Sequence, residues 1–174
     1  MKKTRKDYTW EDQRVYDLWK DMMRRCYNEE YRWKNSSYAG CSVCEEWHVS
    51  TNFKDWVNKQ DCIGKELDKD ILMRGNKVYS PETCVFIDKK INVFLVGSEI
   101  TRGNYPVGVD LIKRTGKFRA RCWNNNGSRV HIGLFTTPEE AHEAWRKFKY
   151  DIACKLADEQ TDLRVAEALR RRYL

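Results

Sequence analysis

The chain has 174 residues, with 33 Lys and Arg against 26 Asp and Glu, and a formal net charge of +7. This length allows one or two small domains, and the basic balance favours an anionic partner, with nucleic acid the leading class. No stretch approaches the ~18 apolar residues of a membrane span, and no apolar signal segment follows the basic start, so the sequence predicts a cytoplasmic protein with its seven cysteines as free thiols.

The first third of the chain alternates helices with polar segments. Apolar residues repeat at helical spacing from Val15 to Cys26, which predicts an amphipathic helix over 11–26, with Thr9 as its N-cap. Residues 27–40 are polar and aromatic and predict a loop, and 41–47 predict a short strand or turn. A second helix is expected from Thr51. It should bury Phe53, Trp56 and Val57.

From Lys65 on, the spacing of the apolar residues changes from a helical to an alternating pattern. Residues 66–72 alternate and predict a strand, 73–83 a turn-rich loop, 84–87 a second strand, and the residues from Asp88 a short helix. Two glycines, a serine and a proline within 97–106 then predict a linker over 98–106. The first domain is therefore expected to span 1–97.

The second domain is expected to span 107–158. Three β-like runs, 107–112, 117–123 and 129–135, precede a helix over 138–158. That helix has a strong start signal: Thr137 as cap, Pro138 at the first position and Glu139 in the first turn. The chain as a whole is thus expected to be α+β, with a three-stranded antiparallel sheet packed on one helix.

Residues 159–174 predict a terminal amphipathic helix that begins near Asp162. Leu163, Leu169 and Tyr173 share one side of it, which can pack on its own chain or pair two copies in a homodimer. The arginines at 170–172 compensate the helix dipole or contact phosphate.

The charged side chains of the second and third β-runs and of the turn before them are all positive. From Lys113 to His131 there are six Lys or Arg and no Asp or Glu. Because side chains alternate across a strand, Phe118, Ala120 and Cys122 should face the helix, and the cations should share the open face. A solvated face normally mixes signs, so this face predicts binding to the major groove of double-stranded DNA, which admits β-ribbons. The predicted DNA-binding residues are Lys113, Arg114, Lys117, Arg119, Arg121, Trp123, Arg129 and His131.

The segment 105–157 resembles the ethylene-response-factor (Apetala-type) DNA-binding domain, which also occurs in mobile-element proteins. The matching residues are Gly108-Val109, Gly116-Lys117-Phe118, Arg119, Arg121, Gly133-Leu134-Phe135 and the helix start TPEEAHEAW. The resemblance implies a three-stranded sheet that reads the major groove. Asp110 stands where the family often has Arg, and Phe118 where it often has Trp, so we expect a different target sequence.

The sequence LDKDILMRGNKVYSPETCVFIDKKIN, residues 67–92, is the second informative segment. Together with LWKDMMRRCYN and CSVCEEW upstream, it resembles phage HNH homing endonucleases over about residues 14–97. The resemblance implies a ββα-metal unit that holds one Mg²⁺. It places Asp68 and Asn92 as metal ligands, Lys69 at the general-base position and Asn76 at the orienting position in the loop.

A lysine is a poor general base in this position. Its ordinary pKa near 10.4 keeps it cationic at neutral pH, and neighbouring Asp68 and Asp70 favour that charge. The nuclease site therefore looks degenerate, and only His48 could replace the missing histidine. Turn and cap chemistry accounts equally for Asp68, Asn76 and Asn92.

The spacing Cys41-x2-Cys44-x3-His48 suggests a zinc site, with Cys62 or Cys84 as a fourth ligand. A single CxxC with scattered partners is a weak signal, and a buried thiol explains Cys44 as well, so zinc is not expected.

The combined features predict a sequence-specific DNA-binding protein derived from a homing endonuclease. It would act in a bacterial host cell as a transcriptional repressor of a phage or mobile element, without cleavage, and would need no cofactor for binding. The alternative is an active Mg²⁺-dependent HNH endonuclease that uses Asp68, Asn92 and either His48 or a substrate-assisted water. An RNA-binding structural protein has little support, because the aromatics are too few for a base-stacking platform.

Overall fold

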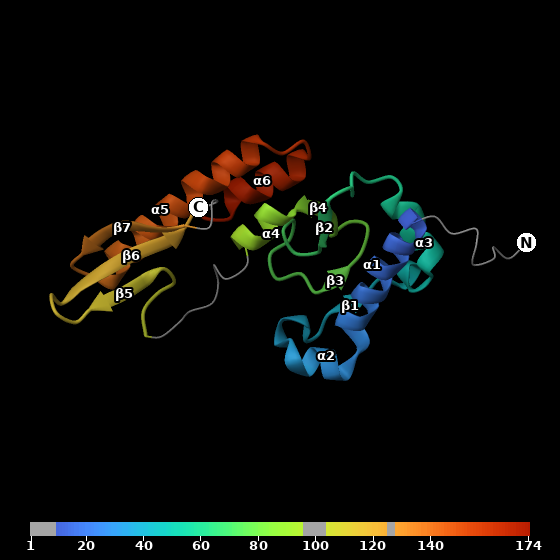
Figure 1. The fold of residues 1–174 in the computed structure, drawn as a ribbon, viewed down its shortest axis with the longest axis horizontal. Helices are drawn as coiled ribbons and strands as arrows, with labels where there is room; N and C mark the ends of the chain where they lie inside the picture. The colour runs from blue at the N-terminus through green and yellow to red at the C-terminus, as the bar shows by residue number, and fades with distance from the viewer. Residues whose placement is uncertain (1–9, 96–103, 125–127) are drawn as a thin grey trace, which may run out of the picture. The chain divides into compact units, whose positions relative to one another are not determined.

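The computed structural model describes residues 10–95, 104–124 and 128–174, and its fold is α+β (Figure 1). It divides into two compact units, 1–88 and 89–174. This division falls earlier than the predicted first domain, 1–97, and it groups the terminal helix with the sheet. Within the described part of the chain, no helix has the length and apolar character needed to cross a membrane.

The first unit begins with the expected helix, α1 (Trp10–Tyr27), which buries Val15, Met22 and Cys26. Its predicted cap, Thr9, lies outside the described residues. The loop predicted over 27–40 was wrong, because this segment forms α2 (Glu29–Lys34) and the short 3-10 helix η2 (Ser36–Tyr38). The Asn28 side chain caps α2 by accepting the Tyr31 N–H at 2.7 Å.

The core of this unit gathers around Trp47. It follows β1 (Ser42–Val43) in the 3-10 helix η3 (Glu45–His48), and it packs edge-on against Phe53 of α3 (Ser50–Val57). The Trp19 indole donates to the Trp47 carbonyl at 2.7 Å, which ties α1 to η3. As expected, α3 buries Phe53 and Val57, whereas Trp56 is only partly buried.

Two small strand pairs complete the first unit. Strands form at both predicted places and pair antiparallel, β2 (Lys65–Asp68) with β4 (Val85–Asp88), but β2 ends at Asp68, so the strand predicted over 66–72 was wrong beyond that residue. The intervening loop also contains a strand that was not predicted, β3 (Val78–Tyr79), which runs parallel to β1. With only two residues, β3 is too short to show an alternating pattern in the sequence.

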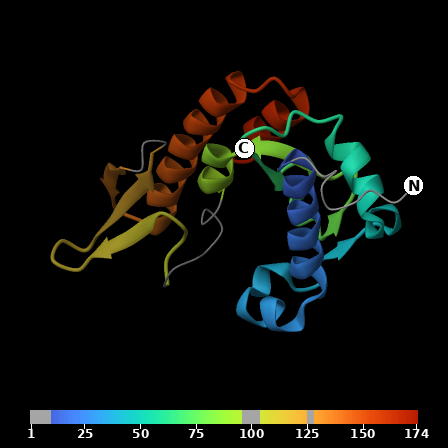
Figure 2. The ribbon, with the colours of Figure 1, turned by 45° about the vertical axis from the view of Figure 1, so that its right-hand side comes forward.

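The second unit is built around α5 (Pro138–Asp158). The antiparallel sheet has the order β5 (Val109–Ile112), β6 (Lys117–Trp123), β7 (Arg129–Phe135) and packs on α5, as predicted (Figures 1 and 2). A capping box confirms the predicted helix start, because Thr137 accepts the Glu140 N–H and the Glu140 side chain accepts the Thr137 N–H.

The join between sheet and helix depends on Gly108. Its φ is +83°, and a Cβ added there would lie 2.1 Å from a ring carbon of Trp145 on α5. His142 stacks on Trp145, and its ring nitrogen Nδ1 lies 2.9 Å from the Val107 carbonyl oxygen. Only glycine combines this backbone conformation with so close an approach.

The rest of α5 is covered by α4 (Lys89–Leu95) and α6 (Leu163–Arg171). Lys90 pairs with Glu159, and Lys149 donates to the Phe94 carbonyl at 2.9 Å, so α4 runs antiparallel to α5. The apolar face of α6 is buried against the same chain through Val165, Ala166 and Leu169, whereas Leu163, predicted to share a side with Leu169 and Tyr173, is exposed. The homodimer predicted through this helix stays a prediction.

Candidate nucleic-acid interface

The open face of the sheet is defined by cross-strand pairs. Arg119 of β6 lies between Asp110 of β5 and Leu134 of β7, Arg121 pairs with His131, and Trp123 pairs with Arg129. Partners in a pair share a face, so these side chains lie on one surface. We call it the reading face. Its residues are Asp110, Arg119, Arg121, Trp123, Arg129, His131 and Leu134.

A β-bulge in β7 determines which residues of this strand lie on the reading face. Ala120 pairs with Gly133 and the next residue, Arg121, pairs with His131, so Ile132 is the extra residue. The bulge reverses the alternation beyond Ile132. Strict alternation from Arg129 and His131 would put Gly133 and Phe135 on the reading face. Leu134 takes that position instead and is 46% exposed.

Asp110 joins the two central arginines. Its Oδ2 accepts from Nη2 of Arg119 at 2.7 Å, and its Oδ1 lies 2.6 Å from Nη2 of Arg121. Burial alone would raise the pKa of Asp110, but hydrogen bonds and charge from both arginines lower it below its ordinary value. The carboxylate is therefore ionised at neutral pH.

The edges of the reading face are more exposed. Trp123 is 62% exposed, and the Arg129 guanidinium lies 5.9 Å from its ring centroid, within cation–π distance. The other predicted cations, Lys113, Arg114 and Lys117, are exposed on the turn between β5 and β6 and at the start of β6. The structure thus brings the predicted DNA-binding residues together on the sheet and its turn.

Charge separates the two units. Residues 1–88 contain 16 Lys and Arg and 16 Asp and Glu, whereas residues 89–174 contain 17 and 10. The whole formal charge of +7 therefore resides in the unit that carries the reading face.

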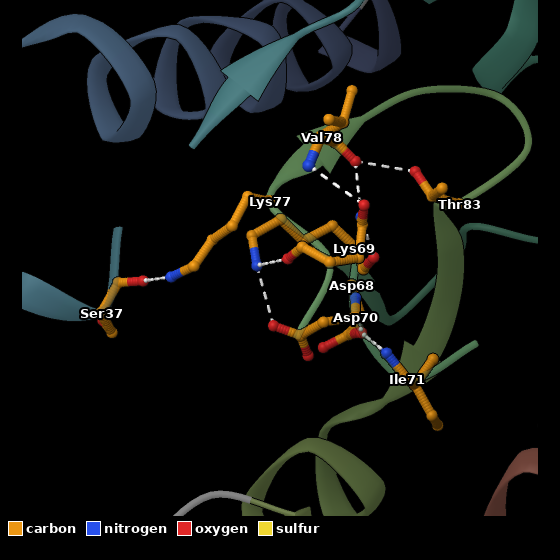
Figure 3. A network of polar contacts seen from close by, with 9 residues as sticks. Ser37, Asp68, Lys69, Asp70, Ile71, Lys77, Val78 and Thr83 are labelled. Carbon is orange, nitrogen blue, oxygen red and sulfur yellow. Dashed lines mark hydrogen bonds and ion pairs between the residues drawn. The ribbon is translucent and has the colours of Figure 1, made fainter. Parts of the chain in front are cut away.

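Of the predicted nuclease residues, Asp68 ends β2 and Lys69 follows it (Figure 3), and Asn76 lies further along the same loop of the first unit. Asp68 Oδ1 accepts the backbone N–H groups of Asp70 and Ile71 at 2.9 and 2.7 Å. The Asn76 side-chain amide donates to the carbonyls of Lys69 and Val78 at 2.7 and 2.6 Å. These bonds fix the conformation of the loop, which is the work of turn residues.

Lys69 is a buried member of the same network. Its ammonium group donates to the Asp70 carboxylate at 2.8 Å and to the Asn76 carbonyl at 3.0 Å (Figure 3). Burial would lower its pKa, but the hydrogen bond and charge of Asp70 outweigh burial and raise the pKa above its ordinary value. A protonated, hydrogen-bonded amine cannot take a proton from water.

The Asp68 side chain does not favour a metal role. One carboxylate oxygen already accepts two amide N–H groups, and burial together with the nearby Asp70 raises the pKa of Asp68. Asn92, the other predicted Mg²⁺ ligand, lies in α4, which belongs to the second unit. The roles assigned to Asp68 and Asn92 stay predictions.

His48 is exposed at the end of η3. Its Nε2 lies 3.2 Å from the Tyr27 hydroxyl and 3.3 Å from the Val43 carbonyl oxygen. Of the cysteines considered for zinc, Cys41 and Cys84 are buried and Cys44 is half-buried, and burial raises the pKa of Cys84 to about 12. All seven cysteines are free thiols. In the described part of the chain, no group of three or more His, Cys, Asp or Glu gathers as a metal site would require.

We compared the chain with models of protein families, with curated proteins and with solved structures, and none of them matches. The two resemblances drawn from the sequence therefore stay predictions.

Proposed function

We propose that this protein binds double-stranded DNA in a sequence-specific manner, with the reading face in the major groove. The observation that carries the proposal is the cationic, partly exposed surface formed by adjacent strands of one small sheet. The major groove is about 12 Å wide and accepts a β-ribbon, and each base pair presents a distinct set of donors and acceptors there.

The residues of this face suit different parts of a duplex. Arg119 and Arg121, at its centre, have the donor geometry for guanine O6 and N7. Lys113, Arg114 and Lys117 lie around the neighbouring turn, where cations supply phosphate attraction and counterion release. Leu134 and Trp123 offer apolar surface for a thymine methyl group.

We further propose that binding occurs without cleavage, so that the protein acts by occupying its site as a transcriptional repressor. The loop-closing hydrogen bonds of Asp68 and Asn76 and the raised pKa of Lys69 support this part of the proposal. The resemblance to phage homing endonucleases suggests a phage or mobile element as the setting. Seven free thiols suit the cytoplasm of its bacterial host.

The test begins with duplexes selected by the protein from a random pool. A supercoiled plasmid that carries the selected site is then incubated with the protein and Mg²⁺ or Mn²⁺. We expect a footprint on the site and intact plasmid. Nicking that is abolished by Asp68→Ala, but not by the surface control Asp55→Ala, would instead establish the HNH nuclease.

A further inference from the structure

Asp110 is an unusual residue for a surface that attracts DNA. Between positions 104 and 138 it is the only acidic residue, among six Lys and Arg. It lies on the edge strand β5, directly opposite Arg119 of the central strand β6. Its side chain is only 34% exposed, and its carboxylate contacts both central arginines.

The contacts of Asp110 leave part of each guanidinium available. On Arg119 the carboxylate takes the Nε side, with Nη2 at 2.7 Å and Nε at 3.4 Å. A guanidinium carries five N–H donors, so the terminal Nη1 and Nη2 edge can still make a bidentate contact. The side chains of Arg119 and Arg121 are 33% and 24% exposed, which lets that edge reach a ligand while the stems stay packed.

The same contacts change how the arginines respond to phosphate. Two arginines held by one carboxylate carry a local charge of +1 instead of +2, so their attraction to any DNA backbone is weaker. Binding to backbone phosphates is independent of sequence, whereas bidentate contacts to base edges discriminate between sequences. A residue that orients the guanidinium groups and offsets their charge therefore favours specific over non-specific binding.

We propose that Asp110 is a specificity-determining, positioning residue of the reading face: it holds Arg119 and Arg121 in the orientation for reading bases and suppresses their binding to phosphate. This inference rests on the proposed DNA-binding function. It goes further by assigning a role in discrimination to an acid that, by charge alone, would only weaken binding.

The experiment compares the full-length wild-type protein with Asp110→Asn, which keeps the shape of the side chain and removes its charge. The control is Glu143→Gln on α5, where the carboxylate pairs with Arg146 through two hydrogen bonds of 3.0 and 2.9 Å. Both variants raise the net charge by one. Affinities for a selected duplex and for a scrambled duplex are measured over a series of salt concentrations.

We expect Asp110→Asn to bind the scrambled duplex more tightly and with a steeper salt dependence, by about one phosphate contact. Its preference for the selected duplex should fall at least ~5-fold, whereas Glu143→Gln should keep the wild-type preference. An equal gain for both duplexes would mean that Asp110 acts as a simple charge, and the inference would be wrong.

Two further readouts separate other outcomes. Circular dichroism and thermal melting establish whether Asp110→Asn folds. The variant Asp110→Glu keeps the charge but moves the carboxylate. It should also lose preference for the selected duplex, but without tighter binding to the scrambled duplex. A full preference in Asp110→Glu would contradict the positioning role. If the wild-type protein bound neither duplex, the proposed function itself would fail, and the two failures are thereby distinguished.

Discussion

Among the residues that the structure describes, each unit buries one lysine, and the two lysines have opposite kinds of surroundings. Lys69 in the first unit is 6% exposed and has a carboxylate partner, Asp70, at 2.8 Å. Lys149 in the second unit is 5% exposed, and its ammonium group meets the Phe94 carbonyl and the rings of Phe94 and Tyr173. The pKa of Lys69 is raised by Asp70, which outweighs burial, whereas burial lowers the pKa of Lys149 to about 8.

This difference extends to the charged residues as a whole. The first unit balances 16 cations with 16 anions, and the polar side chains of the loop after β2 form hydrogen bonds that fix the backbone of that loop. The second unit has seven more cations than anions and presents three of its arginines, Arg119, Arg121 and Arg129, on one sheet face. The comparison teaches that the excess of positive charge is confined to the unit for which we propose DNA binding, and the following predictions test that separation.

The largest expected effect is on the stability of the second unit. Gly108→Ala should destabilise it by roughly 2–5 kcal/mol, because the positive φ and the clash with Trp145 both oppose a Cβ. Gly116→Ala is the matched control, since its φ is +66° but no atom lies within 4 Å of the added Cβ. It should cost only about 1 kcal/mol. Hydrogen exchange resolved by residue should show the loss in the second unit, and equal losses in both variants would contradict the packing argument.

The buried Lys149 should give the second unit a distinctive pH dependence. Between pH 8 and 10.5 the unfolded chain keeps a proton on this lysine that the folded chain releases, so the contribution of Lys149 to stability rises with pH. From pH 7 to pH 10, the wild-type protein should gain about 2–3 kcal/mol relative to Lys149→Met.

The measurement is urea unfolding of both proteins at each pH, and a constant difference between them would refute the lowered pKa. Lys69→Met serves as the comparison from the first unit. Because the folded-state pKa of Lys69 is raised, its stabilising contribution is complete below pH 10.5 and is lost only above that value.

The reading face should lose specific affinity when its central cations are removed. Arg119→Ala and Arg121→Ala should each cost roughly 1–3 kcal/mol of binding to a selected duplex, because each would remove one of the base contacts that we propose. Arg24→Ala in α1, which removes an exposed arginine paired with Asp21, should leave this affinity nearly unchanged. Fluorescence anisotropy titrations provide the measurement. Wild-type affinity in both sheet variants would exclude the face as the reader.

The smallest effect is expected at the turn between β5 and β6. Lys113→Ala should weaken binding to the selected and the scrambled duplex alike, because an exposed lysine attracts phosphate. The slope of log affinity against log salt concentration should become shallower by about one. Lys59→Ala, an exposed lysine of the first unit, should change neither quantity. A loss confined to the selected duplex would assign Lys113 to base reading.

The parts of the fold that could be predicted from sequence have long or redundant signals. Thr137, Pro138 and Glu139 together mark the start of α5, and the three runs of the sheet alternate over several residues. The signal for α2 was overlooked: Asn28 is a good cap and acids follow it, but six residues show no clear apolar period. The strand β3 depends on a distant partner, β1, and has almost no local signal.

The candidate site shows the same division. Alternation alone placed Arg119 and Arg121 on the face opposite Ala120, because it needs only local sequence. The bulge at Ile132, and with it the exposure of Leu134, depends on pairing between strands. The ion pairs of Asp110 with Arg119 and Arg121 are likewise contacts between strands. The sequence could therefore show an acid on the reading face but not the arginines with which it pairs.

The most direct test of DNA reading by the sheet is a selection from random duplexes in the presence of EDTA. The full-length wild-type protein and the Arg119→Ala/Arg121→Ala double variant are used in parallel. We predict that the wild-type protein enriches a defined motif and that the double variant enriches none. DNA reading by the sheet would be contradicted if the wild-type protein enriched no motif, or if both proteins enriched the same motif.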